Sequence, residues 1–263
     1  MMKRVKAIVS YDGTNFSGYQ VQPNKRTVQG ELQRALAVLH KAGEWHATGS
    51  GRTDAGVHSL GQTIHFDTPL SIPEERWHLA LNSLLPEDIV VRSAAFVDGS
   101  FHARFDAVGK MYVYRLWTGS EKNVFTRNYV GHIPGTLSYN NMLAAARHLT
   151  GTHDFTSFSS PKTSVEDKVR KIYSIHIDQQ QDEWEFQFIG SGFLYQMVRI
   201  LTGTLVHVGT GALSPADIPV ILAGKNRSLA GPTAPGNGLY LTKVFYHPDD
   251  LHRETAAVKK KFK

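Results

Sequence analysis

The stretch Val5-Lys6-Ala7-Ile8-Val9-Ser10-Tyr11-Asp12-Gly13 decides the fold class of this chain. Alternate residues from Val5 to Tyr11 are apolar or aromatic, and this two-residue period predicts a strand with one buried face. Asp12-Gly13 is a turn signal that ends the strand. Thr27 is a candidate N-cap, and apolar residues follow it at helical spacing, at Val28, Leu32, Ala35, Leu36 and Leu39. A strand followed by a helix indicates a mixed α and β protein.

The same two periods alternate along the rest of the chain. Further strands are expected at 62–66, 89–97, 107–117, 172–177, 184–189 and 239–246, and further helices at 73–85, 138–149, about 193–208 and from 214. Helices are too few to cover every sheet face, which favours antiparallel sheets. The predicted division is an N-terminal α+β half at 1–105, a C-terminal α+β half at 106–247 and a basic tail at 248–263.

The composition narrows the possible functions. The 263 residues include no cysteine, which excludes a disulfide scaffold, a thiolate nucleophile and cysteine-ligated metals. Lys and Arg number 29 against 23 Asp and Glu, and the resulting charge of +6 favours a polyanionic partner. No apolar run approaches the roughly 20 residues that span a bilayer, and no secretory leader is visible. We therefore expect a cytoplasmic protein without a membrane partner, whose tail is a frayed, solvated end.

The densest candidate site is the loop Gly49-Ser50-Gly51-Arg52-Thr53-Asp54-Ala55-Gly56-Val57-His58. Its glycines allow positive φ angles and close approach of a ligand to the backbone. Gly51 and Gly56 have the spacing of a phosphate-binding loop, but Val57-His58 stands where that motif needs Lys followed by Ser or Thr. The dinucleotide-binding fingerprint fails as well, because its third glycine is missing.

One carboxylate, Asp54, stands in this loop two residues after the guanidinium of Arg52. Asp54 either forms an Asx-turn with its own backbone or acts as an ionised nucleophile or base in a cleft. The second interpretation needs a nearby cation to stabilise the charge, and Arg52 or Arg199 could supply it. Position 199 falls on the polar side of its predicted helix, where a solvated arginine is the ordinary alternative.

Tyr112 and Tyr114 share one face of the strand predicted at 107–117. They either pack in the core or offer a stacking surface to a nucleobase. None of the 13 histidines has the HExxH spacing of a zinc site, and no GxSxG elbow is present. The residues themselves therefore indicate neither a metal enzyme nor a serine hydrolase.

Several blocks, taken in order, resemble the tRNA pseudouridine synthase A family. They are Tyr11-Asp12-Gly13-Thr14-Asn15-Phe16-Ser17-Gly18-Tyr19-Gln20, Thr27-Val28-Gln29-Gly30, the Gly51–His58 loop, Phe101-His102-Ala103-Arg104-Phe105, Tyr112 with Tyr114, His153-Asp154-Phe155-Thr156-Ser157-Phe158, Phe193 to Arg199, and Thr233-Ala234-Pro235 with Gly238-Leu239. Together they extend over residues 5–246. The ordered set is far more specific than any single block.

The resemblance implies an enzyme that isomerises uridine to pseudouridine at positions 38, 39 and 40 of the tRNA anticodon stem-loop. It assigns the catalytic role to Asp54, base stacking to Tyr112, pairing with the aspartate to Arg199, and extrusion of the target nucleotide to Arg52. It further implies two RNA-recognition-module-like (ferredoxin-like) halves with mainly antiparallel sheets joined around a central catalytic cleft, a homodimer, tRNA as the partner and no cofactor.

Two positions depart from the family pattern. Tyr19 stands where members often carry Trp, and Gly236-Asn237 replaces a second proline after Pro235. Neither change touches the residues assigned to the reaction. The alternatives left open are a synthase acting on another RNA site and a catalytically silent RNA-binding module.

Overall fold

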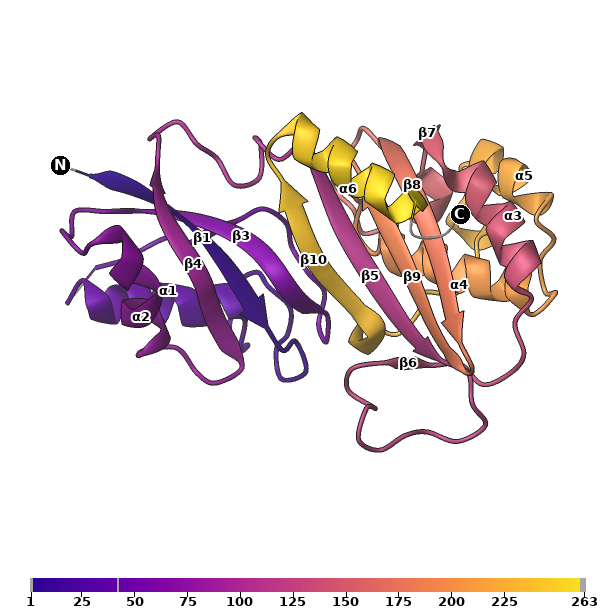
Figure 1. The fold of residues 1–263 in the computed structure, drawn as a ribbon, viewed down its shortest axis with the longest axis horizontal. Coiled ribbons are helices and arrows are strands. Elements are labelled where there is room, and N and C mark those ends of the chain that lie inside the picture. The colour runs from indigo at the N-terminus through magenta and orange to yellow at the C-terminus, as the bar shows by residue number, and fades with distance from the viewer. Residues whose placement is uncertain (1, 42, 261–263) are drawn as a thin grey trace. The chain divides into compact units, whose positions relative to one another are not determined.

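The computed structural model describes residues 2–41 and 43–260, and these form two compact units. The first unit contains the residues up to Ala107 together with Tyr240–Tyr246, and the second contains Val108–Leu239 together with the residues from His247 on. The fold is α+β with mainly antiparallel strand pairing, as predicted (Figure 1). Among the described residues, no helix is both long and apolar enough to cross a membrane.

The first unit has the β-α-β-β-α-β order of a ferredoxin-like module. Its elements are β1 (Lys3–Tyr11), α1 (Val28–Leu39), β2 (Thr48–Gly49), β3 (His58–Thr68), a 3₁₀ turn (Glu74–Arg76), α2 (Trp77–Asn82) and β4 (Ile89–Val97). The strands lie in the order β4-β1-β3-β2 and pair antiparallel. A later strand, β10 (Leu239–Phe245), pairs in parallel with the beginning of β3.

The core of the first unit lies between its sheet and its helices. Val5, Ala7 and Val9 of β1 are fully buried, which confirms the alternation in the sequence. Leu32 and Leu36 of α1 belong to the same apolar cluster. Thr27 caps α1 as predicted, because its Oγ1 accepts a hydrogen bond from the Gly30 N–H at 3.2 Å.

The second unit repeats the arrangement with additions. It contains β5 (Gly109–Trp117), β6 (Gly131–His132), α3 (Tyr139–Leu149), β7 (Gly151–Asp154), a 3₁₀ turn (Thr156–Phe158), β8 (Val169–Gln180), β9 (Glu183–Gly190), α4 (Met197–Gly209), α5 (Asp217–Gly224), 3₁₀ turns at Arg227–Leu229 and Gly236–Gly238, and α6 (Pro248–Lys260). The sheet order is β5-β9-β8-β7, all antiparallel. Figure 1 shows α4 behind this sheet and α6 in front of it.

The element boundaries differ from the prediction where the backbone leaves helical geometry. Within the predicted 73–85 helix, Glu74–Arg76 form a 3₁₀ turn and only Trp77–Asn82 are α-helical. At its end, Leu85 precedes Pro86, a position that disfavours helix. The helix expected from about residue 193 begins at Met197, because Gln196 has a left-handed φ of 61°. Such a φ cannot continue a right-handed helix.

The unit boundaries also differ from the predicted division. Residues 240–246, expected in the second half, group with the first unit. The expected basic tail is ordered as α6 over residues 248–260, with Leu251 and Val258 buried, and it belongs to the second unit. Residues 261–263 of that tail lie outside the described part of the chain.

Candidate active site

The loop that carries Arg52 and Asp54 connects β2 to β3 in the first unit. The Val57 N–H donates to the Asp54 carbonyl at 3.2 Å, and Gly56 has a φ of 74°. Glycine at the third position of a four-residue turn suits a type II turn, which needs positive φ there. Asp54 is half-buried and Arg52 is exposed. The turn therefore begins at Asp54, and Arg52 lies two residues before it.

The block that follows β1 packs directly against this turn. A Cβ added to Gly13 would lie 2.1 Å from the Val57 carbonyl oxygen, and one added to Gly18 would lie 2.8 Å from the Thr53 carbonyl oxygen. Gly18 also has a φ of 95°, which side chains rarely tolerate. The two glycines of this block are thus explained by close backbone contact with the Asp54 loop.

Buried polar side chains beneath the loop were not found from the sequence. Tyr11 shares a 2.8 Å hydrogen bond with Thr53 Oγ1, and Gln62 Nε2 donates to the Gly51 carbonyl at 2.8 Å. Gln62 is fully buried in β3, two residues before the buried Ile64. The signal available in the sequence was a glutamine on the apolar face of a strand, because a buried amide needs partners.

Tyr112 lies on β5 in the second unit, opposite Phe188 of β9. Its side chain is 7% exposed, and its ring meets that of Phe193 edge-on at a centroid distance of 5.2 Å. Its neighbour on the same strand face, Tyr114, is fully buried and donates to the Pro235 carbonyl at 3.0 Å. Burial raises the pKa of Tyr114, so its hydroxyl stays protonated.

Arg199 lies in the first turn of α4, among buried neighbours on both sides. Its Nε donates to the Ala234 carbonyl at 2.7 Å, and the Ala234 N–H donates back to the Arg199 carbonyl at 3.1 Å. A Cβ on Gly203 would lie 1.9 Å from the Pro232 carbonyl oxygen. The segment around Ala234 is therefore pressed against α4 and orients the arginine.

The predicted site residues are divided between the two units. Arg52 and Asp54 share one loop of the first unit, whereas Tyr112 and Arg199 belong to the second unit. The His153–Phe158 block has a structural role: Asp154 accepts from the N–H and the hydroxyl of Thr156 and pairs with Lys225 at 2.8 Å. These contacts lower the pKa of Asp154 to about 2, and Lys225 contributes more to the shift than Thr156 does.

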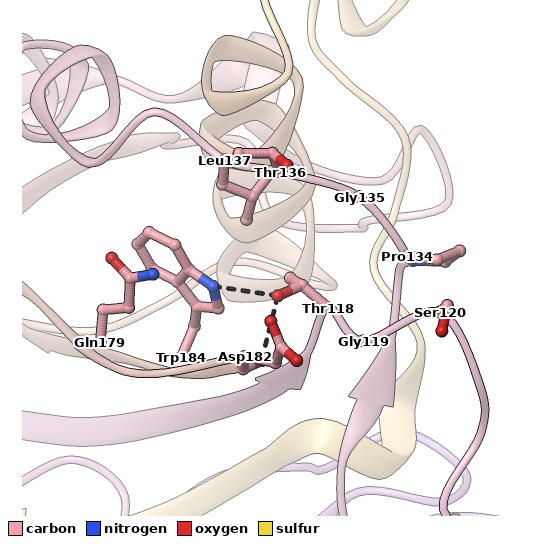
Figure 2. A pocket seen from close by; sticks show the side chains of 10 residues that line it. All are labelled: Thr118, Gly119, Ser120, Pro134, Gly135, Thr136, Leu137, Gln179, Asp182 and Trp184. Atoms are coloured by element: carbon pink, nitrogen blue, oxygen red, sulfur yellow. Dashed lines mark hydrogen bonds between the residues drawn. The ribbon is translucent and has the colours of Figure 1, made fainter.

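A separate cavity of about 440 Å³ lies in the second unit (Figure 2). At its floor the indole N–H of Trp184 donates to Thr118 Oγ1 at 3.3 Å, and that hydroxyl donates to the Asp182 carbonyl at 3.1 Å. None of the predicted site residues lines it. Over residues 2–41 and 43–260, no three His, Asp or Glu side chains are grouped to hold a metal ion.

Known proteins resemble this chain over most of its length. The family model described as tRNA pseudouridine synthase matches residues 7–106 and 145–247. The tRNA pseudouridine synthase A of Anoxybacillus flavithermus is 57% identical over 93% of this chain and 99% of its own length. Those of Geobacillus kaustophilus and Bacillus subtilis are each 54% identical, over 95% and 92% of this chain and over 97% and 99% of their own lengths.

One solved structure, a Cbf5–Nop10–Gar1 complex, aligns with 90% of this chain and 57% of that chain at 12% identity and a TM-score of 0.37. The relatives therefore carry the assignment, and they define the class as an RNA-modifying isomerase. The chain belongs to the tRNA pseudouridine synthase family.

Proposed function

We propose that this protein isomerises uridine to pseudouridine at positions 38, 39 and 40 in the anticodon stem-loop of tRNA, with Asp54 as the catalytic residue. Membership of the family makes the protein an isomerase that acts on tRNA uridine. The observation that carries the residue assignment is the Arg52–Asp54 loop, held against the block that follows β1 by backbone contacts at Gly13 and Gly18. A carboxylate so constrained suits a reaction that needs exact placement.

The reaction breaks the bond between uracil N1 and ribose C1′ and forms a bond between C5 and C1′. The proton on C5 is lost and N1 gains one, so there is no net oxidation or reduction. Asp54 acts on the bound nucleotide as nucleophile or base. This reaction requires neither a thiol nor a phosphate-binding loop, and the sequence contains neither.

The remaining residues bind and orient the nucleotide. Extruding a base from a stem costs a few kcal/mol, and the exposed Arg52 is placed on the same loop as Asp54 to occupy the vacated space. Arg199, oriented by the Ala234 carbonyl, pairs with the carboxylate of Asp54. Tyr112 stacks on the detached uracil.

The partner is tRNA, and the surface charge of +6 supports that assignment. We further propose a homodimer in which one tRNA contacts both subunits, and a cytoplasmic location. Both follow from the family resemblance.

The decisive experiment measures tritium release from tRNA that carries [5-³H]uridine. The native chain should release tritium, and Asp54→Asn should abolish release while tRNA binding persists, because the amide keeps the size of the carboxylate but not its charge. Asp98→Asn, a matched change at an exposed aspartate of the same unit, should behave as the native chain does. Release by Asp54→Asn at the native rate would remove Asp54 from its role.

The same assay separates the alternatives. Tritium release confined to substrates outside the anticodon stem-loop would move the target to another RNA site. Binding of tRNA without any release by the native chain would indicate an RNA-binding module.

A further inference from the structure

Beneath the Asp54 loop lies a group of buried polar side chains to which the proposed function gives no role. Tyr11, Ser50, Thr53 and Gln62 are each at most 7% exposed. Burying polar groups is costly unless they are hydrogen-bonded. The hydrogen bonds of these four residues therefore show which parts of the loop they hold.

Gln62 connects strand β3 to the first part of the loop. Its Oε1 accepts from the Ser50 hydroxyl at 2.6 Å, and its Nε2 donates to the Gly51 carbonyl at 2.8 Å. The Ser50 N–H also donates to the Thr63 carbonyl at 2.8 Å. One side-chain amide thus holds the two residues that immediately precede Arg52.

Tyr11 connects the end of strand β1 to the residue that precedes Asp54. Its hydroxyl lies 2.8 Å from Thr53 Oγ1, and the Thr53 carbonyl accepts from the Tyr19 N–H at 3.0 Å. Burial raises the pKa of Tyr11 to about 12, so the hydroxyl keeps its proton at neutral pH. Thr53 is therefore held through both its side chain and its main chain.

We propose that Tyr11 and Gln62 are positioning residues, which fix the backbone on either side of Arg52 so that the Asp54 carboxylate is held where the reaction needs it. This inference rests on the proposed function. The two strands β1 and β3 form the rigid frame, and the hydrogen bonds transmit that rigidity to the loop. Displacing a reacting group by about 1 Å can cost roughly 100-fold in rate.

The test compares single-turnover tritium release by variants that remove one hydroxyl each. Tyr11→Phe and Thr53→Val should each lower the rate at saturating tRNA by about 10- to 100-fold, with little change in the tRNA concentration for half-maximal rate. The double variant should be slowed by less than the product of the two single effects, because both changes remove the bond between the Tyr11 and Thr53 hydroxyls. Thr53→Ser keeps the hydroxyl and should restore most of the rate, and Gln62→Met should slow it as Tyr11→Phe does.

Tyr19→Phe is the matched control. Tyr19 is another buried tyrosine beneath the same loop, and among the described residues none accepts or donates a hydrogen bond at its hydroxyl. Removing that hydroxyl should leave the rate unchanged.

Two results would overturn the inference while leaving the proposed function intact. One is native rates for Tyr11→Phe and Thr53→Val. The other is a loss of rate that matches the loss of folded protein in thermal unfolding, since that is a purely structural effect. Absence of tritium release from the native chain would instead end the proposed function itself.

Discussion

At the scale of single residues, Tyr19 shows how burial of an unpartnered hydroxyl affects stability. Its ring packs against Gly49, where an added Cβ would lie 2.5 Å from the hydroxyl oxygen. The ring is 2% exposed, and none of the described residues hydrogen-bonds that hydroxyl. A buried, unsatisfied polar atom loses its hydration without compensation.

Tyr19→Phe should therefore make the protein more stable. Removing the unsatisfied hydroxyl should raise the free energy of unfolding by about 1 kcal/mol, measured by urea denaturation. Tyr114→Phe is the opposite control: the Tyr114 hydroxyl donates to the Pro235 carbonyl at 3.0 Å, so its loss should destabilise. A destabilised Tyr19→Phe would show that the hydroxyl has a favourable contact.

The guanidinium of Arg199 is held by a main-chain carbonyl. The Ala234 carbonyl accepts a hydrogen bond from the Arg199 Nε at 2.7 Å. This bond restricts the orientation of the guanidinium. A lysine has neither the planar fork nor a donor at that position.

We expect Arg199→Lys to be almost as inactive as Arg199→Ala, with each slowing tritium release on the order of 100-fold and affecting tRNA binding much less. Arg253→Lys, an exposed arginine of α6, should retain native activity. Full activity in Arg199→Lys would mean that charge alone suffices at this position.

At the scale of elements, an ion pair connects the last residue of β7 to the residue that follows α5. Asp154 accepts from the N–H and the hydroxyl of Thr156 and pairs with Lys225, whose φ of 45° ends the helix. Lys225, then Thr156, lowers the pKa of Asp154 from 3.8 to about 2.

This lowered pKa predicts a pH-dependent contribution to stability. The folded-state pKa lies below the unfolded one, so the stabilisation is complete above about pH 4 and is lost as the pH falls toward about 2. Because Lys225 is 61% exposed, solvent screening limits the effect to about 1 kcal/mol. Asp154→Asn should lower the free energy of urea unfolding by this amount at pH 7 and by progressively less below pH 4.

Lys225→Gln provides the check on that cause. In its background Asp154→Asn should have a smaller effect, since the two side chains form one interaction. An effect of Asp154→Asn that is constant from pH 7 to pH 2 would exclude the ion pair as its origin.

The elements that the sequence predicted well are those determined by residues close together in the sequence. Thr27 and Ser138 cap α1 and α3, and β4 has the predicted bounds, because caps and apolar alternation act within a few residues. The start of α4 could not be predicted, because nothing local makes Gln196 adopt a left-handed φ. In the candidate site, the Asp54 loop was identifiable by its glycines, whereas the bond from Tyr11 to Thr53 joins residues distant in sequence.

At the scale of the whole molecule, the dominant property is the charge of +6. Basic residues that neutralise phosphates release condensed counterions, so the affinity for RNA falls steeply with salt. Net charge says how strongly an RNA is attracted and nothing about which nucleotide is modified.

Binding of tRNA to Asp54→Asn should weaken by roughly 10-fold or more between 50 and 200 mM salt if two or more phosphates are contacted. Filter binding over a salt series gives the slope of log Kd against log salt, and the slope gives the number of phosphates. Arg253→Lys preserves charge and should give the native slope. A flat response would contradict RNA as the partner.

The sequence predicted the strand β10 but not the unit to which it belongs. Its alternation correctly predicted a strand at 239–246. Alternation records which face of a strand is buried and not which strand lies beside it, so residues 240–246 were expected in the second half but group with the first.

This placement has a consequence for biosynthesis. The Ser59 hydroxyl donates to the Leu241 carbonyl at 3.0 Å, and the Tyr246 hydroxyl donates to the Ala103 carbonyl at 2.7 Å. When the ribosome has made residues up to Ala107, β10, which pairs with the beginning of β3 just after the Asp54 loop, has not yet been made. The unit whose translation begins first is completed only when residues 240–246 emerge, so its folding cannot finish until most of the second unit has also been made.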